Sequence, residues 1–317
     1  MSLRPLSDAL QHRAESELHE KPRRIASDLH ALREWLKKQP HLQAVDPSDQ
    51  WLIAFLRGCK FSLERSKEKL EMYYTLRTLI PEFFSERDPL STKIQEILKL
   101  GVFLPLKGSS SGDAARVCVV RLGVFDPTRY HLCDIIKVAF MITEILMLED
   151  DHFVVSGEDV IIDMKGMSLS VVGQWTPALA RKAISCFQGA LPVRQRGYHM
   201  LNTTTGFDAS YAILRSFLSD KLKKRRMVQS FQIQVHNQNY DAMQKEIGKS
   251  VLPAEYGGED GTLLALVDHW KAKVESYSDW FAREESQRSD EARRAGAPGA
   301  GAALFGVEGS FRKLEVD

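Results

Sequence analysis

One short stretch, Asp159-Val-Ile-Ile-Asp-Met-Lys-Gly166, decides the fold of this chain. It is an apolar, β-branched run that ends in a turn signal, and such runs are typical of buried strands. Similar runs at 116–122 and 197–202 predict two further strands, whereas 135–148 and 177–187 have the length and apolar pattern of helices. Strands that alternate with helices in this way indicate an α/β fold with a mostly parallel sheet.

The chain before these strands has a helical pattern. Apolar residues recur at helical spacing from Ile25 to Leu36, and Pro40 ends that stretch. A second helix is expected between the capping sequence at 46–49 and Gly58, and a third from Ser62 onward. The last residues are rich in alanine, glycine and charge, which favours flexibility. We therefore predict a helical bundle at 1–90, an α/β domain at 91–260, a C-terminal helix at 261–285 and a flexible tail at 286–317.

Composition excludes several classes of protein. The 317 residues carry a formal net charge of +1, which argues against a general nucleic-acid binder. No apolar run of about 18 residues occurs, so no membrane span is expected. The first 20 residues are polar and contain acids, unlike a secretory or transit peptide, and the four cysteines are scattered without a CxxC pair. We expect a cytoplasmic protein with reduced thiols.

The sequence offers little support for catalysis. It lacks the HExxH, GxSxG and Walker patterns, and its nine histidines lack metal-ligand spacing. His152 and His199, which lie near predicted strands, are interpreted as structural, with metal binding as the alternative. Asp163 ends a strand, where enzymes often place a carboxylate, but capping of the following turn is the favoured interpretation. We expect no enzyme activity, no metal and no cofactor.

The segment 207–226 carries the strongest functional pattern. Its apolar residues share one helical face: Phe207, Tyr211, Leu214 and Leu218. The same face continues into two cations, Lys221 and Arg225. One interpretation is a core-facing helix whose cations lie in the last turns, where they favour the helix dipole. The other is a lid, whose aromatic side faces a cavity and whose basic end meets anionic phosphates.

Positive charge is concentrated around this helix. Residues 194–226 contain eight lysines and arginines against two aspartates, in a chain whose net charge is +1. Each basic residue beside an anionic membrane leaflet contributes roughly 1 kcal/mol of attraction. A few such residues give reversible docking, which a carrier that loads and unloads at membranes requires.

Several motifs make the chain resemble the CRAL-TRIO (Sec14-like) lipid-carrier family over residues 25–280. They are Leu52-Ile-Ala-Phe-Leu-Arg57 with Lys60-Phe61, Ile161-Ile-Asp-Met-Lys-Gly166, Leu191-Pro-Val-Arg194, Lys221-Leu-Lys-Lys-Arg225 and Leu252-Pro-Ala-Glu-Tyr-Gly-Gly258. The chain is most similar to the branch of tocopherol and retinaldehyde carriers, especially its insect members. A chance match of such motifs in this order is implausible.

The resemblance implies a three-layer α/β domain with a lipid cavity, closed by a helical gate at 206–226. It implies these pocket positions: Ile136, Ala139, Phe140, Thr143, Ile162, Leu169, Ala183, Phe187, Phe207, Tyr211, Leu214 and Leu218. It also implies a basic cleft that binds phosphoinositides through Arg194, Arg196, Lys221 and Arg225. Two positions depart from the family pattern. Cys59 replaces an arginine of the cleft, beside Lys60, and Thr204 replaces a proline at the gate hinge.

Together these patterns predict a monomeric, cytoplasmic carrier that associates peripherally with membranes. It would enclose one hydrophobic ligand, such as a tocopherol, retinoid or carotenoid, and release it when phosphoinositides contact the cleft and open the gate. One alternative is a lipid-sensing signalling or trafficking adaptor. Another is an enzyme that acts on a lipid ester, for which no nucleophile–base pair is found. Related pockets accept different lipids, so ligand identity does not follow from the sequence.

Overall fold

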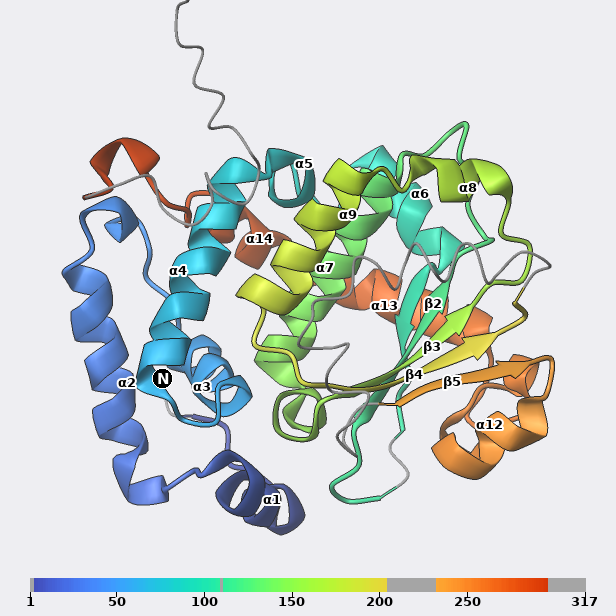
Figure 1. Ribbon diagram of the computed structural model, residues 1–317, viewed down its shortest axis with the longest axis horizontal. Helices are drawn as coiled ribbons and strands as arrows, with labels where there is room; N and C mark the ends of the chain where they lie inside the picture. The colour runs from blue at the N-terminus through green and yellow to red at the C-terminus, as the bar shows by residue number, and fades with distance from the viewer. Residues whose placement is uncertain (1–2, 109–110, 204–231, 296–317) are drawn as a thin grey trace, which may run out of the picture.

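Figure 1 shows the computed structural model, which describes residues 3–108, 111–203 and 232–295. Within these ranges, a helical N-terminal region leads into a mostly parallel five-stranded sheet with helices around it. This is the α/β fold that the sequence predicts. The strands expected near 116–122, 159–164 and 197–202 are all present.

The N-terminal region is built around one buried helix. Its elements are α1 (Asp8–Leu18), α2 (Pro22–Lys37), the 3-10 turn η1 (Pro40–Leu42), α3 (Asp49–Gly58), α4 (Leu63–Leu79), α5 (Pro81–Phe84) and α6 (Thr92–Leu100). Helix α3 begins where the sequence places a cap, because the Ser48 hydroxyl accepts a hydrogen bond from the backbone N–H of Trp51 at 3.2 Å. Residues 51–57 of α3 are all buried, and the helix contacts α2, α4 and α7 (Leu132–Glu149). It therefore forms the centre of the bundle.

The sheet has the strand order β1-β2-β3-β4-β5. The strands are β1 (Phe103–Pro105), β2 (Arg116–Arg121), β3 (Glu158–Asp163), β4 (Gln195–Leu201) and β5 (Gln232–Asn237). β1 pairs antiparallel with β2, and the remaining neighbours are parallel. Parallel pairing brings the carboxyl ends of β2, β3 and β4 to one edge of the sheet.

Two strands differ from the sequence prediction. Neither β5 nor the short β1 is among the strands predicted from the sequence. The segment Gln232-Ile-Gln-Val-His-Asn237 alternates polar and apolar residues, so it lacks the apolar run that marks β2 and β3. Within the described ranges β5 pairs only with β4. An edge strand needs less apolar surface than a central one, which explains why its sequence is polar.

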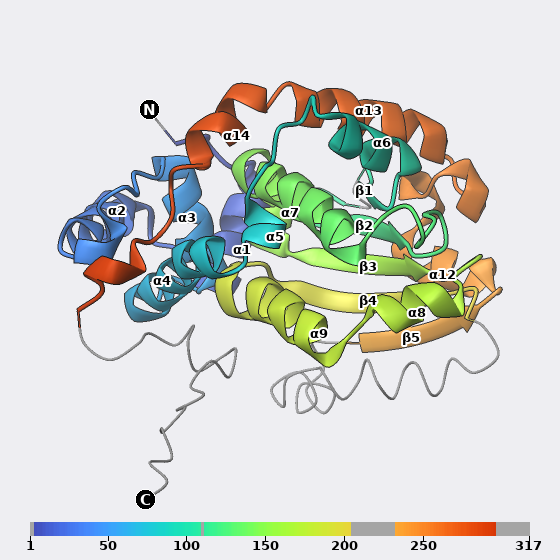
Figure 2. The same ribbon diagram turned by 90° about the horizontal axis from the view of Figure 1, so that it is seen from above.

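Helices connect the parallel strands and then return to the bundle. α7 and the π-helical turn η2 (His152–Ser156) lie between β2 and β3, whereas α8 (Leu169–Gln174), α9 (Pro177–Ile184) and the π-helical turn η3 (Ser185–Ala190) lie between β3 and β4. After β5, α12 (Tyr240–Ile247) packs on that strand and is followed by the turns η4 (Lys249–Val251) and η5 (Ala254–Tyr256). Figure 2 shows α13 (Leu263–Glu275) and α14 (Ser278–Glu284) running along one side of the molecule, from the sheet to the bundle.

The bundle and the α/β domain meet very closely at one point. A Cβ atom on Gly58 would lie 1.9 Å from the carbonyl oxygen of Pro192, so only glycine fits the end of α3 here. The ammonium group of Lys69 in α4 donates a hydrogen bond to the carbonyl oxygen of Leu191 at 2.6 Å. The Leu191–Arg194 motif is thus fixed from the bundle side, which sets the place where β4 starts.

A buried arginine cluster (Tyr73, Arg77, Arg87 and Glu144) forms a second junction. The Glu144 carboxylate of α7 accepts a hydrogen bond from the Tyr73 hydroxyl at 2.6 Å and pairs with Arg87 at 2.5 Å. Arg77 lies 3.6 Å from the same carboxylate. The Arg87 guanidinium also lies over the ring of Phe281 in α14. Three separate parts of the chain are therefore joined at one carboxylate.

The segment that follows α14 lies against the bundle. The Thr78 hydroxyl donates a hydrogen bond to the carbonyl oxygen of Ser289 at 2.6 Å, and the Arg294 guanidinium pairs with Glu71 of α4. A last 3-10 turn, η6 (Glu291–Arg293), contacts η1. The structure thus differs from the flexible tail predicted at 286–317, because side chains of α4 hold residues 286–295. Residues 296–317 lie outside the described ranges.

Candidate functional site

Predicted pocket residues meet where α7 packs against η3. The rings of Phe140 and Phe187 are stacked, with their centroids 4.4 Å apart. Phe140 is fully buried and also contacts the ring of Phe84 in α5. Ile136, one turn before Phe140, and Ala183 of α9 belong to the same apolar core. We call this group (Ile136, Phe140, Ala183 and Phe187) the apolar wall.

Two other predicted pocket residues of α7 have local roles. The Thr143 hydroxyl donates a hydrogen bond to the carbonyl oxygen of Ala139 at 2.8 Å, so it is already paired within the helix. Orientation of a ligand by Thr143 would require this hydrogen bond to break. Ala139 lines a small apolar cavity of about 10 Å³ beside Trp270 of α13. The structure therefore places Ala139 on the α13 side of α7.

Ile162 and Leu169 lie on β3 and just beyond it. Side chains alternate along a strand, so Ile162 points to the face opposite Asp163, whose carboxylate meets the segment after α12. Ile162 is half-buried, but Leu169 is 88% exposed at the start of α8. The described residues therefore do not bring Leu169 together with the apolar wall. The remaining predicted pocket residues, Phe207, Tyr211, Leu214 and Leu218, lie outside the described ranges.

Asp163 is a cap that links two of the sequence motifs. Its Oδ1 accepts hydrogen bonds from the backbone N–H of Lys165 at 2.9 Å and from the Asn202 amide at 2.8 Å, and its Oδ2 accepts one from the Tyr256 hydroxyl at 2.8 Å. Burial and the Asp163 carboxylate together raise the pKa of Tyr256, so the hydroxyl stays protonated and donates. Of the two interpretations of Asp163, the capping role fits these contacts.

Glu158 is a buried acid at the start of β3. It is 7% exposed, and by strand alternation it shares a face with Ile162. Burial raises its pKa to about 7, although hydrogen bonds with Cys118 and Gln195 act in the opposite direction. A carboxyl group with this pKa is partly protonated at neutral pH. In that form it can donate a hydrogen bond to the polar end of a ligand on this face of the sheet.

The predicted basic residues Arg194 and Arg196 lie where β3 and β4 begin side by side. Gly157 has a φ of +90°, and a Cβ atom on it would lie 2.2 Å from the carbonyl oxygen of Arg194. The backbone N–H of Glu158 donates to that same oxygen at 2.9 Å. The Arg194 guanidinium turns back to donate to the carbonyl oxygen of Val155 in η2. Arg194 is thus fixed by the backbone on both sides.

An acid from α1 lies between the two arginines. Glu17 Oε2 is 2.8 Å from Arg194 and 3.5 Å from Arg196, and Glu17 Oε1 is 3.0 Å from Arg13. The exposed fractions are 35% for Glu17, 15% for Arg194 and 37% for Arg196, so water reaches the group. Burial favours a higher pKa for Glu17, but the hydrogen bond from Arg194 and the charges of the arginines outweigh it and lower the pKa. We call Arg13, Glu17, Arg194 and Arg196 the Glu17 cluster.

Sequence reasoning misses Arg13 and Glu17. The only local signal is their i,i+4 spacing, which is common on any exposed helix face. The contact of Glu17 with Arg194 spans 177 positions of the chain, and nothing in the residues of α1 predicts it. The structure thus adds α1 to the predicted basic cleft.

The bundle corner of the predicted cleft lacks the family's arginine at Cys59. Cys59 is buried, and this burial raises the pKa of its thiol. Lys60 is exposed and has a φ of 55°. Arg57 is buried and pairs with Glu20 at 2.9 Å. Lys60 is therefore the cation that faces solvent at this corner, whereas Lys221 and Arg225 lie outside the described ranges.

The histidines near the strands make structural contacts. His152 Nδ1 lies 2.9 Å from the carbonyl oxygen of Ala114. His199 of β4 stacks on His236 of β5, with ring nitrogens 3.1 Å apart. Within the described ranges, no group of three or more His, Cys, Asp or Glu is arranged to hold a metal ion. In the same part of the chain, no helix combines the length and apolar character that a membrane span needs.

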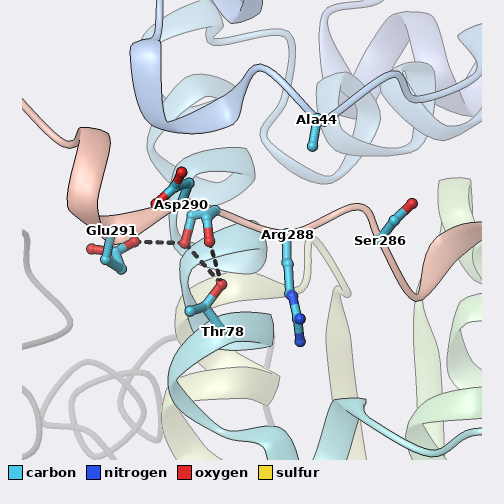
Figure 3. Close-up of a pocket in the computed structure, with 7 residues that line it drawn as sticks. Ala44, Thr78, Ser286, Arg288, Asp290 and Glu291 are labelled. Atoms are coloured by element: carbon cyan, nitrogen blue, oxygen red, sulfur yellow. Dashed lines mark hydrogen bonds between the residues drawn. The ribbon is translucent and has the colours of Figure 1, made fainter.

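An open polar groove lies apart from the predicted sites. Figure 3 shows it between Thr78, Ala44 and the segment after α14, and its volume is about 500 Å³. Its lining contains Arg288, Asp290 and Glu291, and it includes none of the predicted pocket or cleft residues. The groove follows from the docking of residues 286–295 on the bundle.

Family models match two stretches of the chain. Residues 21–94 match a Pinta-like UBA domain, and residues 111–258 match the CRAL/TRIO domain. Residues 111–258 thus carry a CRAL/TRIO domain. The CRAL/TRIO match contains β2 to β5, the apolar wall, Asp163, and Arg194 and Arg196 of the Glu17 cluster. Arg13 and Glu17 lie before the start of either match.

Curated relatives cover most of the chain. The human protein "Alpha-tocopherol transfer protein-like" is 28% identical over 282 residues, which is 89% of this chain and 79% of that protein. Clavesin-2 of Rattus norvegicus is 28% identical over 284 residues, 86% of this chain and 84% of that protein. Among solved structures, the crystal structure of Sfh5 matches with a TM-score of 0.47 and 15% identity, over 83% of this chain and 92% of that one.

Proposed function

We propose that this CRAL/TRIO protein binds one hydrophobic lipid in its α/β domain and carries it between membranes. The observation that carries the proposal is the apolar wall, which lies inside the CRAL/TRIO match and joins α7, α9 and η3. A relative named as tocopherol transfer protein-like supports a ligand of the tocopherol, retinoid or carotenoid type. Burial of such a chain contributes about 25 cal/mol per Å² without any covalent step.

The proposal assigns the gate to residues 206–226, between β4 and β5 in the sequence. Release follows when phosphoinositide headgroups bind the basic cleft. Arg194 and Arg196 of this cleft lie at the start of β4. The protein would therefore bind anionic membranes peripherally and reversibly. The carrier needs no catalytic group, and Asp163 is already engaged as a cap.

Lipid extraction followed by a transfer assay tests this function. Organic extraction and mass spectrometry of the purified protein should recover an isoprenoid-type lipid. A fluorescent tocopherol analogue should load onto the emptied protein and pass faster to acceptor vesicles that contain phosphatidylinositol bisphosphate than to phosphatidylcholine vesicles. Phe187→Ala should weaken loading by about tenfold, because Phe187 is half-buried and removal of its ring loses up to roughly 1.5–3 kcal/mol of transfer free energy, part of which the ligand contributes.

A matched control uses Leu264→Ala, since Leu264 is a large apolar residue of α13 that is 69% exposed. That variant should load like the wild type. Failure of the wild-type protein to retain or load any lipid would contradict the carrier function. If the protein loads lipid but shows no preference for phosphoinositide vesicles, the carrier function stands and the proposed release step is wrong.

A further inference from the structure

Helix α1 is attached to the α/β domain by a contact of its own. Leu10, Ala14 and Leu18 are buried against Val155 in a small apolar cluster separate from the main core. The main core does not include these side chains. The buried pair between Glu20 and Arg57 anchors the chain just after α1. Helix α1 therefore packs on the α/β domain through its own apolar contact, and the Glu20–Arg57 pair holds the chain where the helix ends.

One carboxylate lies among three arginines where α1 meets β4. One carboxylate, that of Glu17, lies within 3.5 Å of the guanidinium groups of Arg13, Arg194 and Arg196. The acids farther out are Asp113, which lies 3.5 Å from Arg13, and Asp159, which interacts with Arg196. The acid nearest to Arg194 and Arg196 is thus Glu17, whose single negative charge lies among the positive charges of three arginines.

A phosphate suits this arrangement better than a carboxylate does. A phosphate monoester carries about −1.5 to −2 charges at neutral pH and three strong acceptor oxygens, whereas a carboxylate carries one charge and two oxygens. Arginine forks bind both groups through paired, charge-assisted hydrogen bonds. Arg194 is held in place by the carbonyl oxygen of Val155, so its fork keeps its direction when the anion changes.

We infer that Glu17 is an internal competitor that occupies the phosphate site of Arg194 and Arg196 until a phosphoinositide membrane displaces it. The inference rests on the proposed function, because it concerns the same basic cleft. A phosphorylated headgroup replaces the Glu17 carboxylate, which is exposed enough to turn into water. Phosphatidylserine carries a phosphodiester, a carboxylate and an ammonium group, so it lacks the phosphate monoester whose greater charge displaces Glu17. The competition therefore favours headgroups with several phosphates over other anionic lipids.

Vesicle co-sedimentation of Glu17 variants tests the inference. Phosphatidylcholine vesicles are prepared with phosphatidylinositol bisphosphate or with phosphatidylserine at matched surface charge. Glu17→Gln should bind phosphatidylinositol bisphosphate vesicles about fivefold more tightly than the wild type, as expected for release of one partly exposed ion pair. It should also bind phosphatidylserine vesicles better, so its preference for phosphoinositides should fall. Glu17→Asp should show part of the gain, because it withdraws the carboxylate from Arg194 while it keeps the charge.

The control is Glu15→Gln, which removes the same charge from an exposed position of the same helix. It should bind like the wild type. If Glu15→Gln and Glu17→Gln gain the same affinity for vesicles, the gain is explained by net charge alone and the inference is wrong. If Glu17→Gln binds like the wild type while Arg196→Ala binds more weakly, the inference fails and the proposed cleft stands. If no variant, Glu17→Gln included, distinguishes phosphoinositide from phosphatidylcholine vesicles, the proposed cleft fails together with the inference.

Discussion

Two clusters of arginine and glutamate hold parts of this chain together, and they differ in exposure. In the buried arginine cluster, Arg87 and Glu144 are 0% exposed and lie 2.5 Å apart. In the Glu17 cluster, Glu17 and Arg196 each keep about a third of their surface in water. The same residue types therefore make a fixed joint between the bundle and α7 in one place and a replaceable contact between α1 and β4 in the other.

Solvent explains the difference between the clusters. A buried ion has lost its water, so loss of its partner leaves an uncompensated charge. A half-exposed ion regains water when its partner leaves, and salt or another anion can take the partner's place. Nε and Nη2 of Arg87 have no hydrogen-bond partner within the described ranges, so Glu144 and the rings of Phe84 and Phe281 stabilise its charge.

The largest expected effect follows from breaking the buried joint. Arg87→Ala should lower the free energy of unfolding by about 3–5 kcal/mol, because Glu144 would stay buried without that counter-charge. Urea denaturation followed by circular dichroism measures the loss. The loss should be the same at low and high salt, since buried pairs are poorly screened.

A control replaces all three charges with apolar side chains. Arg77→Met, Arg87→Met and Glu144→Leu together should recover much of the stability that Arg87→Ala loses, because Glu144 is then no longer a buried charge without its partner. The Tyr73 hydroxyl would then lack its acceptor, so recovery should be incomplete. A triple variant less stable than Arg87→Ala would show that the charges themselves contribute net stability, contrary to this comparison.

Acid tests the comparison at another buried group, His199, which forms no ion pair within residues 3–108, 111–203 and 232–295. Burial, followed by the adjacent His236, lowers its pKa to about 4, although Glu246 of α12 and Gln234 of β5 act in the opposite direction. The folded pKa lies below the unfolded value of about 6.5, so the unfolded chain binds the proton first. Stability is therefore complete above pH 6.5 and is lost as the pH falls from there towards 4. Between pH 7 and pH 5 the loss from His199 should be about 2 kcal/mol.

Comparison of His199→Gln with the wild type isolates this contribution. Free energies of unfolding measured from pH 7 to pH 5 should fall less steeply in the variant, by about the 2 kcal/mol assigned to the titration. His30→Gln, at an exposed position of α2, is the control and should follow the wild-type slope. Parallel pH profiles for His199→Gln and the wild type would contradict the lowered pKa of His199 in the folded chain.

The fold could be predicted from the sequence where burial leaves a pattern. β2 and β3 are apolar runs, so their position follows from the residues alone. β5 could not be predicted, because its polar and apolar residues alternate and its place is set by pairing with β4. The docking of residues 286–295 was equally hidden, since it depends on Thr78 and Glu71 about two hundred positions earlier in the chain.

The candidate site divides in the same way. Arg194 and Arg196 follow from motif and charge, and the structure does place them together at the start of β4. The two interpretations of Asp163 remained open until the Tyr256 hydroxyl, 93 positions away, was located on its carboxylate. Glu17 could not be found in advance, because an i,i+4 pair on a surface helix is common and its third partner is remote. Contacts between distant segments are the part that composition and spacing do not encode.

The smallest expected effect comes from the exposed side of the comparison. Glu17→Gln should lower the free energy of unfolding by about 0.2–1 kcal/mol at low salt, because the arginines around it are partly hydrated once the carboxylate is gone. The difference from the wild type should shrink as salt rises, since ions screen a half-exposed pair. Urea denaturation at low and high salt measures both. A loss as large as that of Arg87→Ala, and as insensitive to salt, would make the Glu17 cluster a structural joint, which no headgroup could displace without unfolding the start of β4.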